Sequence, residues 1–88
     1  MLKIEISKRA AKFLKELHGK QARQVGTKIQ ELRNNPSPND SIKLKGHPYR
    51  RTDIGEYRIV YYVETDILKI HVVGKRNDDE VYKILRRE

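Results

Sequence analysis

The stretch that decides the fold runs from Gly55 to Val63 and reads GEYRIVYYV. Its first two residues suit a tight hairpin turn with glycine where the backbone needs a positive φ, and the rest is rich in β-branched and aromatic residues. We therefore predict antiparallel strands over residues 49–54 and 57–64, joined by a two-residue turn.

Counting outward from that turn sets the register of the two strands. Asp53 should lie opposite Arg58, and Arg51 opposite Val60. Because side chains alternate along a strand, each face of the sheet receives its own set. One face should carry Arg51, Asp53, Arg58, Val60 and Tyr62. The other, more apolar face should pack on helices and carries Ile54, Tyr57, Ile59, Tyr61 and Val63.

Before this hairpin the sequence predicts one strand followed by two helices. After the hairpin it predicts one strand and one helix. Residues 2–6 alternate like a half-buried strand, and Ser7 is placed to cap a helix with apolar side chains at helical spacing. A second amphipathic helix is predicted for about residues 20–34. After a loop rich in Asn and Pro come the hairpin, a strand over residues 67–75, and a helix over about residues 78–86, capped by Asn77 or Asp78.

These elements predict a single α+β domain over residues 1–88, in the order β-α-α-β-β-β-α. A small antiparallel sheet should carry the N-terminal helical hairpin on one face, with the C-terminal helix following it. Eighty-eight residues leave no room for a second core.

Composition points to a polyanionic partner. The chain has 20 Lys and Arg against 12 Asp and Glu, a formal net charge of +8, and residues 1–34 carry most of it. A basic face that only keeps the protein in solution is the alternative. The absence of cysteine excludes disulfides and thiolate metal sites. No apolar run is long enough to span a membrane and no signal peptide is visible, so we expect a cytoplasmic protein.

Three arginines and a tyrosine form the candidate site. Arg51 and Arg58 share a sheet face, Arg76 ends the next strand, and Tyr82 follows on the last helix. Arginine binds phosphate oxygens through two parallel hydrogen bonds, and a tyrosine ring can stack on a base or take part in proton transfer. Each residue also has a purely structural interpretation. Arg58 could pair with Asp53, Arg76 could be a solvated charge, and Tyr82 could extend an apolar helix face.

The three histidines are scattered, and only His47 lies in a loop near the candidate site. No spacing of His and carboxylates predicts a metal site, and no nucleophilic triad or phosphate-binding glycine loop is present. We therefore expect no metal and no cofactor.

Across nearly its whole length the chain resembles RelE-type toxins of the RelE/ParE toxin–antitoxin superfamily. The helical hairpin, the segment Lys43–Tyr49 (KLKGHPY), the stretch 55–61, and VGKR at 73–76 with Val81–Tyr82 carry the resemblance. It implies a metal-independent endoribonuclease that cuts mRNA on the ribosome and so inhibits translation, with the RNA 2′-hydroxyl as nucleophile. It also implies a RelB-like antitoxin that binds the toxin in a hetero-oligomeric complex.

The resemblance assigns the family's functional arginines to Arg58 and Arg76 and its C-terminal tyrosine to Tyr82. A basic pair on the preceding strand corresponds to Arg51 and Asp53, so the second position is acidic here. Asp53 would weaken phosphate binding, accept a proton in place of a lysine, or mark a branch with little nuclease activity. Contacts to RNA and the ribosome are expected from basic residues and one histidine: Lys12, Lys15, Arg23, Lys43, Lys45 and His47.

Two other functions share this scaffold. ParE-like relatives inhibit DNA gyrase and are not nucleases, and a non-catalytic homologue would bind RNA or sequester an antitoxin.

Overall fold

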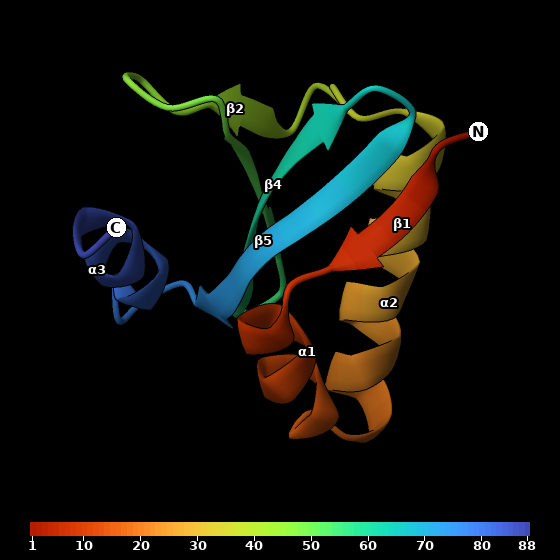
Figure 1. Ribbon diagram of the computed structural model, residues 1–88. Helices are drawn as coiled ribbons and strands as arrows, with labels where there is room; N and C mark the ends of the chain where they lie inside the picture. Colours follow the sequence, from red (N-terminus) through yellow and green to blue (C-terminus); the bar gives the residue numbers. More distant parts are fainter.

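The computed structural model describes residues 1–88 as an α+β fold in which helices cover both faces of one sheet (Figure 1). Its elements are β1 (Lys3–Ile6), α1 (Lys8–Lys15), α2 (Gly19–Asn34), β2 (Ser41–Lys43), β3 (Arg50–Ile54), β4 (Tyr57–Glu64), β5 (Ile67–Lys75) and α3 (Glu80–Arg86). The predicted fold class and helical hairpin are confirmed. The order β-α-α-β-β-β-α omitted one element, the short strand β2.

The five strands lie in the order β1-β5-β4-β3-β2. All neighbours are antiparallel except β1, which pairs in parallel with β5 from Lys3 opposite Ile67 to Ile6 opposite Ile70. Parallel neighbours need a crossover connection, and the α1–α2 hairpin, which follows β1 in the chain, begins that connection. The sheet is therefore mixed at this one edge.

The predicted hairpin register is confirmed residue by residue. Ile54 lies opposite Tyr57, Asp53 opposite Arg58 and Arg51 opposite Val60. Gly55 has a φ of 58°, the left-handed conformation that favours glycine and lets two residues close the turn.

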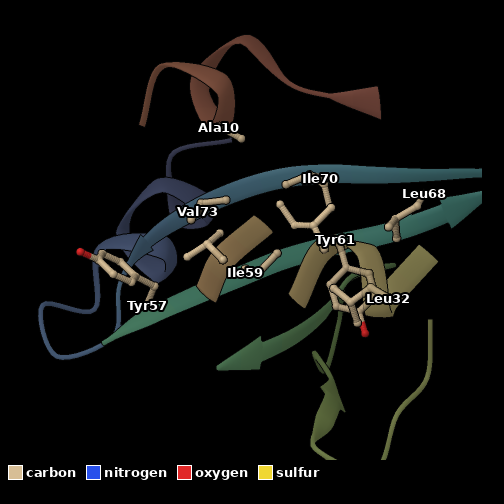
Figure 2. Packing of buried hydrophobic residues seen from close by; sticks show 10 residues of the cluster. Ala10, Leu32, Tyr57, Ile59, Tyr61, Leu68, Ile70 and Val73 are labelled. Atoms are coloured by element: carbon tan, nitrogen blue, oxygen red, sulfur yellow. The ribbon is translucent and has the colours of Figure 1, made fainter. Parts of the chain in front are cut away.

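The main core lies between the sheet and the helices α1 and α2. Figure 2 shows Ile59 and Tyr61 of β4 and Ile70 of β5 in this layer, with Ala10 of α1 and Leu32 of α2. All five are at most 5% exposed. This confirms that the apolar side of β4 packs on the helical hairpin, apart from Val63 near its end, which is 41% exposed.

A second, smaller core lies on the opposite face of the sheet, beneath α3, so the expectation that the chain has room for only one core was wrong. Val60 and Val72 pack there against Val81 and Leu85 of the helix. Gly74 makes this close approach possible, because a Cβ at that position would lie 3.1 Å from Cγ1 of Val81. The face predicted to be open is therefore half covered, and Val60 is fully buried.

A bulge at His71 shifts the alternation of side chains along β5. Val60 pairs with Val72 but Tyr61 pairs with Ile70, which leaves His71 as an extra residue. Ile70 and Val73 therefore belong to the main core, while Val72 belongs to the core beneath α3.

The helix ends agree with the sequence at one helix and differ at another. Ser7 caps α1 as predicted, its Oγ accepting a hydrogen bond from the Ala10 N–H at 3.1 Å. The last helix begins at Glu80, later than predicted, because Asp79 has a left-handed φ of 51° and makes no side-chain cap. No helix combines the length and the apolar character that crossing a membrane requires.

Candidate functional site

Arg58 and Asp53 form a two-pronged ion pair across the β3–β4 hairpin. Nε of Arg58 donates to Oδ1 of Asp53 at 2.7 Å, and Nη2 donates to Oδ2 at 3.1 Å. Arg51 approaches the same carboxylate from its own strand, with Nη1 3.4 Å from Oδ2. The side chains of Arg58 and Asp53 are 12% and 27% exposed, so water screens the pair only partly.

Tyr82 completes the cluster from α3. Cζ of Arg58 lies 5.2 Å from the centre of the Tyr82 ring, within the range of a cation–π contact. Tyr82 is also half-buried against the core beneath α3. The structural interpretation of Tyr82 therefore holds, and the same ring contacts the arginine, while stacking on a base stays a prediction.

Arg76 lies at the margin of the cluster. It follows β5, is exposed, and its side chain forms no ion pair, while its backbone N–H donates to the Glu56 carbonyl at 2.8 Å. Its charge still reaches Asp53 and contributes to lowering the pKa of that carboxyl group. Arg76 is thus the one arginine of the cluster whose guanidinium no protein group occupies.

The electrostatics of the cluster favour the charged forms of Asp53 and Arg58. Hydrogen bonds from Arg58 lower the pKa of Asp53 below its ordinary value, against the effect of burial, and the charges of Arg58, Arg51 and Arg76 lower it further. The same hydrogen bond raises the pKa of Arg58. Three guanidinium groups around one carboxylate leave a local net charge of about +2, which suits an anion.

A hollow of about 220 Å³ adjoins Tyr82 on the same side of the molecule. It lies between α3 and the loop before β3, and its lining residues are Leu44, Lys45, His47, Tyr82, Leu85 and Arg86. Two rings and two cations around a hollow of this size suit a planar base with a neighbouring phosphate. Lys45 and His47, two of the predicted RNA contacts, are therefore adjacent to the arginine cluster, and Lys43 lies exposed at the end of β2.

The other predicted RNA contacts lie elsewhere. Lys12 and Lys15 are exposed on α1, and Arg23 lines a separate hollow of about 290 Å³ along α2 with Lys20 and Lys28. Both helices cover the sheet face opposite the arginine cluster (Figure 1). The predicted basic residues therefore form two groups on different sides of the sheet.

Sequence reasoning missed an aromatic stack beside the cluster. The Tyr49 ring is stacked on His71 at 4.6 Å and on His47 at 5.6 Å between ring centres. Glu88 joins this group, with Oε2 2.8 Å from Nε2 of His71 and 3.3 Å from Nη1 of Arg9. Burial and Glu88 raise the pKa of Tyr49. His71 is the extra residue of the bulge and shares this face with Val72, and no residue pattern signals the bulge.

No group of three or more His, Asp or Glu side chains lies close enough together to hold a metal ion.

Comparison with protein families gives one match that spans most of the chain. A model of the ParE toxin of the type II toxin–antitoxin system parDE matches residues 4–80. Comparison with curated protein sequences gives no match.

Solved structures of RelE toxins are similar in fold and, at a lower level, in sequence. The chain is 31% identical to a protein of the RelB–RelE antitoxin–toxin complex from Methanococcus jannaschii, with a TM-score of 0.69 over 88% of this chain and 95% of that one. For the archaeal RelE–RelB complex from Pyrococcus horikoshii the identity is 28%, the TM-score 0.75, and the coverage 85% and 94%. For isolated E. coli RelE the identity is 25% and the TM-score 0.78, over 99% of this chain and 97% of that one.

Proposed function

Because the chain belongs to the ParE toxin family of type II toxin–antitoxin systems, within the RelE/ParE superfamily, we propose that this toxin is an endoribonuclease that cuts mRNA on the ribosome. The observation that carries the proposal is the convergence of Arg51, Arg58 and Tyr82, with Arg76 at the margin, beside a hollow of base size. This arrangement offers cations for one phosphodiester and rings for the base next to it.

In the proposed reaction the RNA supplies its own nucleophile. The 2′-oxygen forms a bond to phosphorus as the bond from phosphorus to the 5′-oxygen breaks, the 2′-hydroxyl proton passes to water, and the 5′-oxygen takes up a proton. Arg58 and Arg76, assisted by Arg51, stabilise the extra negative charge of the five-coordinate phosphorus. One well-placed donor of this kind contributes about 3–4 kcal/mol. Tyr82 orients the base by stacking, and no cofactor takes part.

The remaining basic residues are proposed to hold the ribosome. Lys43, Lys45 and His47 lie beside the cleavage site and would contact RNA next to the scissile bond. Lys12, Lys15 and Arg23 lie on the helical side and would contact a second segment of ribosomal RNA. The relatives from Methanococcus jannaschii and Pyrococcus horikoshii are each described in complex with RelB, which supports a RelB-like antitoxin as the partner of this toxin in a hetero-oligomer.

Arg76→Ala is the sharpest test, because the Arg76 side chain is exposed and forms no ion pair, so the fold should tolerate its loss. Primer extension on a translated message should show cuts inside codons with the unaltered toxin. Arg76→Ala should slow them about 10²- to 10³-fold. Arg87→Ala removes the same charge from an exposed position at the end of α3 and should leave cleavage unchanged. Equal cleavage by both variants would refute the proposed site.

Inhibition of DNA gyrase is the second candidate, and two observations favour it. The matching family model describes ParE toxins. In addition, Nε and Nη2 of Arg58 already donate to Asp53, so they are not free to bind a phosphate. Loss of supercoiling by purified gyrase, with no cleavage of ribosome-bound mRNA, would select this function. Binding to ribosomes without cleavage or gyrase inhibition would instead identify a non-catalytic RNA-binding homologue.

A further inference from the structure

We infer that the Asp53 carboxylate is an internal substitute for the substrate phosphate: it holds Arg58 in its binding position in the free toxin, and RNA must displace it. The inference rests on the proposed function and names the residue that controls access to that site. Asp53 is a positioning residue in this scheme, because it acts through Arg58.

The geometry of the ion pair carries the first step. Arg58 donates from Nε and Nη2 to the two oxygens of Asp53 at 2.7 and 3.1 Å. A phosphodiester presents two oxygens to the same edge of a guanidinium, so carboxylate and phosphate compete for the same donors. Because the Tyr82 ring also contacts this guanidinium, Arg58 stays in position for either anion.

Charge carries the second step. The carboxylate of Asp53 lies within contact range of both Arg51 and Arg58, so a phosphate bound there would meet a like charge while Asp53 remained in place. Displacement relieves that repulsion. The Asp53 side chain is 27% exposed, so it can turn outward into water when a phosphate replaces it.

Binding of a non-cleavable probe tests the inference without relying on catalysis. The probe is a single-stranded RNA trinucleotide with 2′-O-methyl groups, which keeps the phosphates but has no free nucleophile. Asp53→Asn should bind it about tenfold more tightly than the unaltered toxin, because phosphate no longer competes with a charge-assisted pair.

Glu56→Gln is the matched control. Glu56 lies exposed in the turn of the same hairpin and forms no ion pair, so this variant changes the overall charge equally. Its affinity should rise less than twofold, since only long-range attraction changes. Asp53→Asn should give no gain in an Arg58→Ala background. Equal gains for Asp53→Asn and Glu56→Gln, or a gain that persists without Arg58, would overturn the inference.

Two further measurements keep the test decisive. If Asp53→Asn does not fold, NMR of the unaltered toxin can follow the pKa of Asp53, which should rise as the probe binds, and an unchanged pKa would overturn the inference. On ribosomes, Asp53→Asn should cleave at least as fast as the unaltered toxin. Loss of cleavage with unchanged probe binding would assign Asp53 to proton transfer and refute its role as a phosphate substitute. If no variant cleaves mRNA, the proposed function fails, while the probe still decides the role of Asp53.

Discussion

Truncating Leu85 to alanine should release α3 from the sheet and leave the main core intact. Leu85 is 5% exposed and packs in the small core with Val60, Val72 and Val81. Leu→Ala changes in cores cost about 2–5 kcal/mol, and a site at the edge of a small cluster that can partly collapse belongs near the lower end, about 2–3 kcal/mol. A helix of seven residues is not stable by itself, so this loss should appear as local opening of α3.

Amide hydrogen exchange measures that opening directly. A loss of 2–3 kcal/mol in docking should speed exchange roughly 30- to 140-fold at the amide of Lys83, which donates to the Asp79 carbonyl in the first turn of α3. The amides of Ile59 and Tyr61 in β4 should keep their protection. Because Tyr82 moves with α3, its contact with Arg58 should also be lost, and cleavage should fall although no residue of the arginine cluster has changed.

Leu32→Ala provides the contrast. Leu32 is fully buried in the main core, and its truncation should cost about 3 kcal/mol of global stability, measured by urea unfolding. Equal acceleration at Lys83 and Ile59 in Leu85→Ala would show that α3 unfolds only with the whole domain. Unchanged exchange at Lys83 would show that Leu85 does not hold the helix. Either result would refute the argument for two separable cores.

Two more predictions concern the arginine cluster and the hairpin turn. Because Arg58 lowers the pKa of Asp53, this pair stabilises the fold above the ordinary carboxyl pKa of 3.8, and its contribution is lost as the pH falls through the lowered folded value; urea unfolding between pH 2 and 6 should show a smaller decline for Asp53→Asn, and identical declines would contradict the pairing. Gly55→Ala should lower the free energy of unfolding by about 1–2 kcal/mol, since φ is 58° and a Cβ would lie 3.0 Å from Oε1 of Gln24. Gly26→Ala, in open space on α2, should raise the free energy of unfolding by about 0.5–1 kcal/mol. Thermal unfolding that ranks the two variants in the opposite order would refute this.

The sequence predicted the hairpin closely because its determinants are local. One glycine with a positive φ fixes the turn, and counting from it places Asp53 opposite Arg58 and separates the two faces of β4. The strand β2 escaped prediction because its three residues carry no period, and pairing with β3 at the sheet edge is what makes them a strand. The parallel partnership of β1 and β5 joins segments about 60 residues apart, which local patterns do not encode.

The sequence predicted which residues share the sheet face and offered the Arg58–Asp53 pair as one alternative, but it did not predict the aromatic stack beside them. Alternation placed Arg51, Asp53 and Arg58 on one face, but which partner holds the Arg58 guanidinium depends on side-chain geometry. The cover provided by α3 was signalled weakly by the i, i+4 spacing of Val81 and Leu85, whose apolar face needs a partner.

The extra residue at His71 puts the two halves of β5 out of phase. Before it, the even-numbered Leu68 and Ile70 point to the helical hairpin, and after it the odd-numbered Val73 does. In the first half of β5 the even-numbered residues therefore face the helical hairpin, and in the second half the odd-numbered residues do. Removing that single residue would restore regular alternation and leave Val72 and Val73 on their present faces, so the insertion does not sort the later side chains; what it adds is the imidazole that stacks on Tyr49 and meets Glu88.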